Sequence, residues 1–242
     1  MHGVPDSIEP STPNPRFDAV LFDFHGTLAQ VEDPIAWVTA AAASCGARLD
    51  RGRATVLADR LVTAGRAGGP LPYRIPPSLA EDWANRDLCQ DAHRSAFTGL
   101  ARTVQSDIDG LADALYQRCV ESVGWRVYAD TVATLRALRA AGRQVAVVSN
   151  IGFDIRGISA DLGFADLVDT FALSYEVGRC KPDPMIFTTA CAALRVDPER
   201  VLVVGDTLAD AGAVRAGCVA LILPETGPGT VHGLGAVLDL AT

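Results

Sequence analysis

The chain has 242 residues, of which 49% are hydrophobic and 21% charged, so it can bury a full core and is neither disordered nor fibrous. Its length suits one large domain, or one domain that carries a second. The formal net charge of −8 argues against nucleic acid or an anionic membrane surface as partners, because basic side chains supply most of that affinity. A small-molecule substrate is the expected partner, and nothing in the sequence indicates an oligomeric state.

The six cysteines include no Cys-x-x-Cys pair and no neighbouring His at ligand spacing, which argues against a zinc site or a disulfide framework. The amino-terminal region lacks a basic segment followed by an apolar core. The longest uncharged apolar-rich run, residues 35–47, has 13 residues, too few for a transmembrane helix. We therefore expect a reduced, cytoplasmic protein.

The first part of the chain divides into three segments. Residues 1–16 carry four prolines among polar residues and predict a flexible amino-terminal arm. The apolar run 17–22 stops at Asp23 and predicts a strand that leads into a turn. Residues 33–123 are rich in Ala, Leu and Arg at helical spacing and predict about four helices, with breaks in the Gly- and Pro-rich stretch 65–77.

Beyond Tyr128 the pattern alternates between helices and short, continuously apolar strands. The predicted helices cover 131–141, 153–162, 184–195 and 208–216, and the predicted strands cover 144–148, 168–173, 201–204 and 219–223. This alternation predicts an α/β fold whose parallel, Rossmann-like sheet is covered on both faces. Residues 17–32 and 124–242 would form this core, and residues 33–123 an inserted helical domain.

Polar residues stand at the carboxyl ends of three predicted strands. They are Asp23, the pair Ser149-Asn150, and Asp206. Ligands of open parallel sheets bind outside these strand ends, so we expect the three groups to converge in one pocket.

Asp23, Asp206 and Asp210, one helical turn after Asp206, would bring three carboxylates together. Like charges at such a separation raise one another's pKa unless a cation binds, and Mg²⁺ prefers oxygen ligands of this kind together with substrate phosphate. Ser149 and Asn150 offer donors suited to phosphoryl oxygens. Lys181, the only lysine of the chain, supplies a compact positive charge.

Four motifs in this order resemble those of the haloacid dehalogenase-like hydrolase superfamily, in the form that carries a helical cap. They are Asp23-Phe24-His25-Gly26-Thr27-Leu28, Ser149-Asn150, Lys181-Pro182-Asp183-Pro184, and Gly205-Asp206-Thr207-Leu208-Ala209-Asp210. The resemblance extends from about Phe17 to Pro224, and the ordered set is far more specific than any one motif.

The resemblance implies a role for each matching position. Asp23 would be the nucleophile that forms an aspartyl phosphate, and Lys181 would screen the nucleophile and the phosphate. Thr27, Ser149 and Asn150 would bind phosphate, although a turn cap is the ordinary role of such residues. Asp23, Asp206, Asp210 and the main-chain carbonyl of His25 would hold Mg²⁺.

The inserted helices would act as the cap that selects the substrate and excludes water. Cap side chains that could contact the substrate, or be ordinary core or surface residues, are Tyr73, Arg74, Trp83, His93 and Arg94.

His25 is where the chain departs from the family pattern, because most phosphatases of this family carry a second Asp there as general acid and base. An imidazole, with an ordinary pKa of about 6.5, can perform both tasks, or can be a purely structural group. Mg²⁺-dependent hydrolysis of a small phosphate monoester is the function expected. The alternatives are a 2-haloacid dehalogenase, whose relatives also lack the second Asp, and a phosphate-binding protein with impaired turnover.

Overall fold

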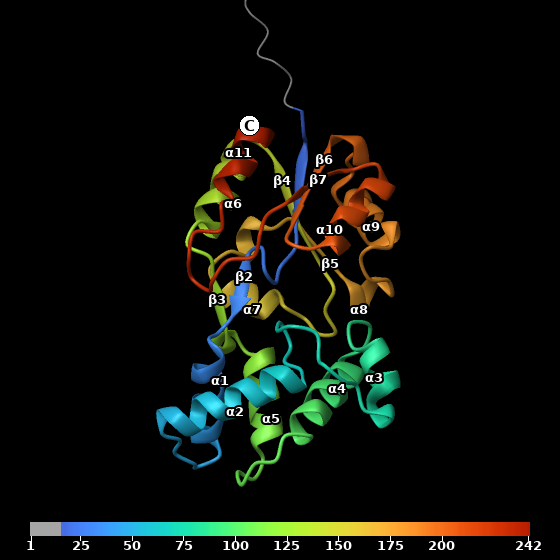
Figure 1. Cartoon of the computed structure of the whole chain (residues 1–242). Coiled ribbons are helices and arrows are strands. Elements are labelled where there is room, and N and C mark those ends of the chain that lie inside the picture. Colours follow the sequence, from blue (N-terminus) through green and yellow to red (C-terminus); the bar gives the residue numbers. More distant parts are fainter. Residues whose placement is uncertain (1–15) are drawn as a thin grey trace, which may run out of the picture.

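A computed structural model describes residues 16–242 (Figure 1). Five parallel strands form one sheet in the order β5-β4-β1-β6-β7, which confirms the predicted α/β class. The central strand is the first of the chain, because it pairs with β4 on one side and with β6 on the other. The strands are β1 (Ala19–Phe22), β4 (Gln144–Ser149), β5 (Thr170–Leu173), β6 (Val201–Gly205) and β7 (Val219–Ile222).

Side chains of β1 alternate between two separate apolar cores, one on each face of the sheet. Val20 and Phe22 pack with one group of helices, whereas Ala19 and Leu21 pack with the other. Both faces of the sheet are thus buried, which is why the strand sequences are continuously apolar. The first core is closed by α6 (Thr131–Ala140), α7 (Arg156–Asp161) and α11 (Gly235–Ala241), and the second by α9 (Pro184–Leu194) and η5 (Gly212–Ala216).

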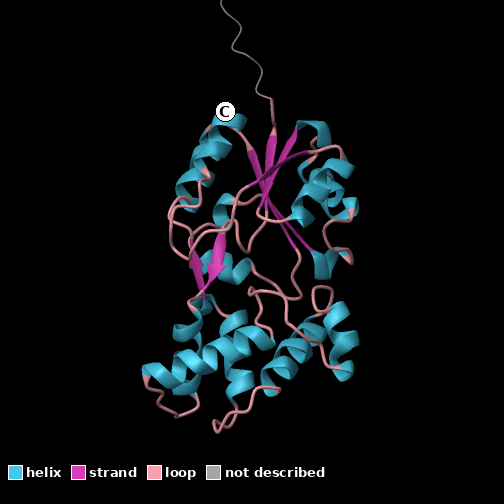
Figure 2. Ribbon diagram, in the orientation of Figure 1, coloured by secondary structure: helices cyan, strands magenta, loops and turns pink. Residues whose placement is uncertain are grey.

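Five helices stand in the sequence between β2 (Ala29–Val31) and β3 (Trp125–Val127), and they lie together below the carboxyl ends of the sheet strands (Figures 1 and 2). They are α1 (Pro34–Ser44), α2 (Arg51–Ala64), α3 (Ala80–Asn85), α4 (Gln90–Arg102) and α5 (Leu111–Val120), with a short 3-10 helix η1 (Pro77–Leu79) before α3. Their own apolar cluster includes Trp37, Leu61 and Leu115. This arrangement supports the proposed division into a core and an inserted cap, and we call α1–α5 the cap helices. The predicted arm lies, apart from Arg16, outside the described residues.

A two-stranded antiparallel ribbon joins the sheet to the cap helices. It pairs β2 (Ala29–Val31) with β3 (Trp125–Val127), and the sequence analysis did not predict it. Strands of three residues carry too little alternation to be recognised from sequence. The chain enters the cap helices after β2 and returns to the core through β3. The position of this ribbon therefore sets where the cap helices lie relative to the site.

The remaining differences from prediction are local. The helix expected over 208–216 is instead α10 (Leu208–Ala211) followed by the 3-10 turn η5, and at this junction a Cβ on Gly212 would lie 2.5 Å from that of Pro182. Three further short elements were not predicted: α8 (Ser174–Val177), η4 (Pro198–Arg200) and α11. The structure also contains the 3-10 turns η2 (Ser122–Gly124) and η3 (Ala165–Leu167). Within residues 16–242, no helix combines the length and apolar character needed to cross a membrane.

Candidate active site

The carboxyl ends of β1, β4 and β6 bring the predicted polar residues to one edge of the sheet. The main-chain N–H of Asp23 donates to Val204 O over 2.9 Å, so the residue after β1 is still held by the neighbouring strand. Asp23 is only 8% exposed, and Ser149, the last residue of β4, is 2% exposed. The nucleophile expected from the resemblance therefore sits on a rigid support rather than on a loose loop.

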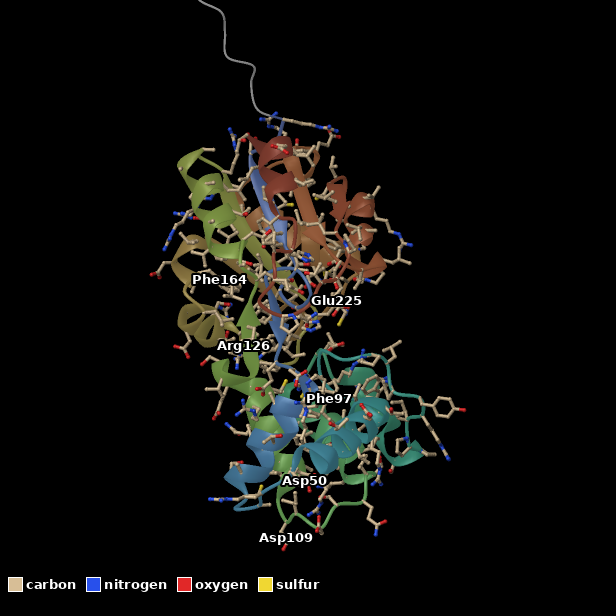
Figure 3. All side chains as sticks on the ribbon, turned by 60° about the vertical axis from the view of Figure 1, so that its left-hand side comes forward. Asp50, Phe97, Asp109, Arg126, Phe164 and Glu225 are labelled. Carbon is tan, nitrogen blue, oxygen red and sulfur yellow. The ribbon has the colours of Figure 1, made fainter. Side chains whose placement is uncertain are left out.

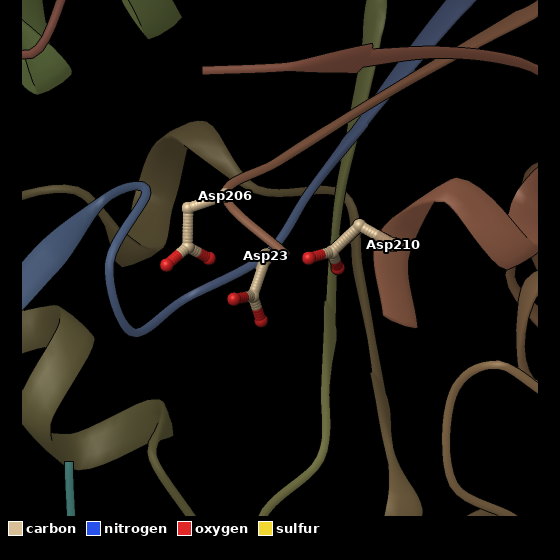
Figure 4. Close-up of side chains that lie close together, drawn as sticks. All are labelled: Asp23, Asp206 and Asp210. Atoms are coloured by element: carbon tan, nitrogen blue, oxygen red, sulfur yellow. The ribbon is translucent and has the colours of Figure 1, made fainter. Parts of the chain in front are cut away.

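Asp23, Asp206 and Asp210 form a compact group of carboxylates, as Figure 4 shows. One carboxylate oxygen from each lies within 4.8 Å of the others. Asp210 is fixed by a capping box, because its Oδ2 accepts bonds from the Thr207 main-chain N–H (3.1 Å) and from Thr207 Oγ1 (2.7 Å). The predicted convergence of the three carboxylates is thus present.

Two glycines allow the backbone to approach this group closely. A Cβ on Gly26 would lie 2.3 Å from Asp206 Oδ2, and a Cβ on Gly205 would lie 2.1 Å from Asp210 Cγ. Gly26 also has φ +84°, a left-handed conformation that other residues adopt only with strain. The motif glycines therefore leave room for the carboxylates to gather.

Lys181 is the cation of the site. Its Nζ donates to Asp23 Oδ1 over 2.6 Å and to Asp210 Oδ1 over 2.7 Å. The side-chain amide of Asn150 brackets the lysine main chain, since its Oδ1 accepts from Lys181 N (2.6 Å) and its Nδ2 donates to Lys181 O (3.0 Å). Asn150 thus positions Lys181, and its predicted contact with phosphate stays a proposal.

Burial and mutual repulsion set the charges of the group. Burial raises the pKa of Asp23 to about 6, against the opposing charge of Lys181. Burial, together with the charges of Asp23 and Asp210, raises the pKa of Asp206 to about 7. For Asp210, burial also acts upward, but the charge and hydrogen bond of Lys181 hold its pKa below the usual value. The group has three carboxyl groups and one ammonium, which bonds to Asp23 and Asp210. When the carboxyls are ionised, the negative charge therefore exceeds the positive charge.

The donors present fit a hard divalent cation. Asp206 Oδ1 is buried and has no hydrogen-bond partner, although it lies beside two other carboxylates. A buried carboxylate oxygen without a partner is costly, and a metal ion would satisfy it. Among the described residues, the group with this geometry contains the three aspartates and not the His25 imidazole. The main-chain carbonyl of His25 remains a predicted ligand.

His25 faces the cap side of the site. Its ring stands edge-on to Trp125, with centroids 5.8 Å apart, and its Nε2 is buried without a hydrogen-bond partner. Burial lowers the pKa of His25, against the upward effects of the Glu225 charge and of a hydrogen bond with Gln30. Thr27 Oγ1 is likewise buried without a partner. Both groups have unused hydrogen-bonding capacity, which suits a ligand, and their predicted roles stay proposals.

A cavity of about 180 Å³ lies between the strand ends and the cap helices. Its core side includes His25, Ser149 and Asn150, and its cap side includes Phe97, which Figure 3 labels at the junction of the two parts. Of the predicted cap contacts, Trp83 and His93 line this cavity.

The other predicted cap contacts lie elsewhere. Tyr73 is 93% exposed and, with Arg74, borders a different hollow of the cap surface. Arg94 pairs with Asp113 on the surface, at 2.9 Å. These three residues do not line the cavity beside the strand ends.

Two arginines that the sequence analysis did not select, Arg66 and Arg86, also line the cavity. The only sequence signal for Arg66 is its place inside the glycine-rich stretch 65–70, which predicts a break between helices. Arg86 lies in the short connection between α3 and α4 and carries no motif. Their proximity to the strand ends follows from how the cap helices fold back, which local pattern does not reveal.

The parallel sheet with a group of aspartates and a lysine at its strand ends is compared with known families below. The sequence model of the haloacid dehalogenase-like hydrolase family matches residues 17–217, and the chain belongs to that family. The ordered motifs predicted this family.

Two known proteins are similar in sequence to part of this chain. The chain is 34% identical over 131 residues to a phosphoglycolate phosphatase of Nitrosospira multiformis, covering 48% of this chain and 56% of that protein. It is 35% identical over 97 residues to the haloacid dehalogenase-like hydrolase domain-containing protein 3 of Mus musculus, and this match covers 40% of this chain and 39% of that protein. The match thus spans about half or less of these relatives.

Solved structures show the same fold over nearly the whole chain. A crystal structure of a dehalogenase superposes with a TM-score of 0.63, 24% identity, and coverage of 93% of this chain and 96% of that one. At this identity the likeness establishes the architecture, while the choice of reaction depends on the site residues.

Proposed function

We propose that this protein is a Mg²⁺-dependent hydrolase of small phosphate monoesters that works through an aspartyl-phosphate intermediate on Asp23. The observation that carries the proposal is the group of three aspartates around Lys181, with an unpartnered oxygen on Asp206. A phosphoglycolate phosphatase among the relatives agrees with this choice. The proposed site residues are Asp23, His25, Thr27, Ser149, Asn150, Lys181, Asp206 and Asp210.

Each residue has a defined task in the proposed reaction. Mg²⁺, held by Asp23, Asp206 and Asp210, would supply positive charge to the phosphoryl oxygens. Asp23 attacks phosphorus, the bond to the ester oxygen breaks, and the leaving alcohol takes a proton from His25 or water. Thr27, Ser149, Asn150 and Lys181 hold the transferring group. Water then attacks phosphorus, which releases inorganic phosphate and a proton and restores the Asp23 carboxylate.

Phosphate release from a panel of monoesters, with and without Mg²⁺, tests this proposal. We expect metal-dependent turnover that Asp23→Asn abolishes, while the melting temperature shows that the variant is folded. Single turnover in ¹⁸O-labelled water is expected to label the released phosphate and to leave Asp23 unlabelled, because water attacks phosphorus. Turnover that is indifferent to Mg²⁺ or to Asp23→Asn would refute the proposal.

The second candidate is a 2-haloacid dehalogenase, which the solved dehalogenase with the same fold and the absence of an Asp at position 25 favour. In that reaction Asp23 would displace halide from carbon, and water would then attack the carboxyl carbon of the ester. The label from ¹⁸O-water would therefore enter Asp23, and halide release would need no metal. The family resemblance implies that dehalogenases lose the acidic fourth motif, so Asp206 and Asp210 favour the phosphatase. Phosphate affinity without turnover of either substrate class would indicate the impaired binding protein.

A further inference from the structure

Gln30, in the middle of β2, places a buried side-chain amide beside the candidate active site. The residue is 4% exposed. Its Nε2 donates to Glu225 Oε1, and its Oε1 accepts from the main-chain N–H of Val31 over 3.1 Å. The amide also forms hydrogen bonds with the Tyr128 hydroxyl and with the His25 ring. A primary amide has two donor hydrogens and two acceptor lone pairs, so these bonds use its full capacity.

The partners of the amide decide which way round it lies. An ionised carboxylate only accepts hydrogen bonds, so Glu225 must face the Nε2 end. The Tyr128 hydroxyl has one hydrogen, which it donates to Thr226 O over 3.0 Å, so it too accepts from Nε2. A main-chain N–H already occupies one lone pair of Oε1. The second lone pair of Oε1 is therefore the position that is left for the His25 ring.

This position fixes the tautomer of His25. The ring has to donate a hydrogen to Gln30 Oε1, and the upward effect of this bond on the pKa of His25 agrees with a ring that donates. Because Nε2 has no hydrogen-bond partner, the bond uses Nδ1. In a neutral imidazole one nitrogen carries the hydrogen and the other is an acceptor, so a hydrogen on Nδ1 leaves a lone pair on Nε2.

Nε2 is the ring nitrogen on the cavity side. His25 and Gly68 both line the cavity, and a Cβ on Gly68 would lie 2.7 Å from Nε2. Trp125 supports the other side of the arrangement, because it meets the His25 ring edge-on with centroids 5.8 Å apart. A free lone pair at Nε2 can take a proton from water, and the same nitrogen, once protonated, can give a proton to a leaving alcohol.

We propose that Gln30 and Glu225 are positioning residues that hold the His25 imidazole with its hydrogen on Nδ1 and with Nε2 free for proton transfer. Glu225 sets the orientation of the Gln30 amide, and the amide sets the tautomer of His25. The chain of bonds runs from the loop after β7, through β2, to the turn after β1. The part of His25 in proton transfer rests on the proposed phosphatase function, whereas its tautomer does not depend on turnover.

¹⁵N NMR of the full chain tests the tautomer directly, because the chain has only four histidines. At about pH 8, above the ordinary imidazole pKa of about 6.5, we expect His25 to carry its hydrogen on Nδ1. Gln30→Leu removes the acceptor and Glu225→Ala releases the amide, so each variant should shift His25 towards a mixture of the two tautomers. Glu225→Gln keeps an acceptor for the amide and should restore most of the wild-type spectrum.

Two results of this measurement would overturn the proposal. One is a wild-type His25 with its hydrogen on Nε2, and the other is the wild-type tautomer in a folded Gln30→Leu or Glu225→Ala protein. Because Glu225 is exposed, Glu225→Ala keeps the test decisive even if Gln30→Leu does not fold.

Single-turnover release of the leaving group, with Mg²⁺, tests the consequence for catalysis. Benzyl phosphate releases an alcohol that needs a proton as it leaves, whereas 4-nitrophenyl phosphate releases a stable phenolate. We expect Gln30→Leu and Glu225→Ala to slow release of benzyl alcohol about ten- to a hundredfold and to leave release of 4-nitrophenolate nearly unchanged. The matched control is Glu121→Ala, which removes the acceptor of an exposed amide, that of Gln117 at 2.7 Å, and should keep both rates.

The two measurements separate failure of this inference from failure of the proposed function. Equal slowing of the two esters, or no slowing of either, in a folded Glu225→Ala protein would overturn the role in proton transfer. If the wild type turns over neither ester, the proposed phosphatase function fails, and the His25 tautomer in the wild type and in the variants decides the positioning role alone.

Discussion

The ammonium of Lys181 lies 2.6 Å from the Asp23 carboxylate, although 158 positions separate the two residues. The contact joins the connection between α8 and α9 to the end of the central strand. An ammonium fits between Asp23 and Asp210 because it is compact and its donors can reach two acceptors, whereas a guanidinium presents a wide, flat fork. This geometry explains why position 181 carries a lysine, although the other basic residues of the chain are arginines.

Replacing Lys181 should therefore reduce both catalysis and stability. We expect Lys181→Met to lower kcat about 10²- to 10³-fold, as for the loss of one group that stabilises transition-state charge. Loss of one partner from a buried ion pair should also destabilise the fold by about 3–5 kcal/mol. Steady-state kinetics and urea unfolding measure the two effects. The control is Arg179→Met, which removes a half-exposed cation two residues earlier, and comparable losses in that variant would contradict the prediction.

The raised pKa of Asp206 predicts a particular dependence of stability on pH. In the folded, metal-free protein this pKa is about 7, whereas the ordinary value for Asp is 3.8, so between these pH values the folded state holds a proton that the unfolded state has lost. The contribution of Asp206 to stability is therefore present at low pH and is lost as pH rises towards 7, by at most about 1.4 kcal/mol per pH unit. Asp206→Asn should be more stable than the wild type at pH 8, and the difference should shrink towards pH 5.

Urea unfolding in a chelator at several pH values measures this difference. Millimolar Mg²⁺ should stabilise the wild type at pH 8 and stabilise Asp206→Asn less, because the ion takes the place of the proton. A difference between the two proteins that is the same at pH 5 and pH 8 would show that Asp206 does not carry the shifted pKa.

Gly26 and Gly142 form a matched pair for testing the close approach of the backbone to Asp206. Both have left-handed φ values, +84° and +74°, but a Cβ on Gly142 would meet nothing within 4 Å. Substitution by Ala should cost each about 1–2 kcal/mol of conformational strain. Only Gly26→Ala should also displace the Asp206 carboxylate, with a roughly hundredfold loss of Mg²⁺-dependent turnover. Similar activity in the two variants would show that the Asp206 carboxylate moves aside freely.

Ser174 links the strand-end loop to the cap. Its Oγ accepts from Ile151 N over 2.8 Å and donates to the main-chain oxygen of Asp87, which lies between α3 and α4. Ser174→Ala should weaken the docking of the cap, so amide exchange of residues 86–93 should accelerate and KM should rise by more than kcat falls. Ser159→Ala is a suitable control, because Ser159 is equally buried but its Oγ has no partner. Unchanged exchange in Ser174→Ala would exclude this link as a determinant of cap docking.

Sequence alone was sufficient for the elements that depend on local pattern. Short apolar runs that end in Asp23, Ser149 or Asp206 predict strands of a sheet buried on both faces, because such strands alternate between two dry cores and show no polar face. The parallel arrangement also predicts that these residues meet at one edge. Their spacing in four ordered motifs was enough to identify the family, which the match over residues 17–217 establishes.

Tertiary structure decided what depends on contacts between distant segments. The β2–β3 ribbon is too short to be recognised from its own residues, and the side-chain amide of Asn150 is taken up by Lys181, 31 positions away. Arg66 resembles any helix-end arginine until the fold buries it beside the cavity, while Arg118 takes up the Glu32 carboxylate. Whether a charge is paired is a property of its surroundings in space, since the cost of burying it depends on which partners the fold brings within reach.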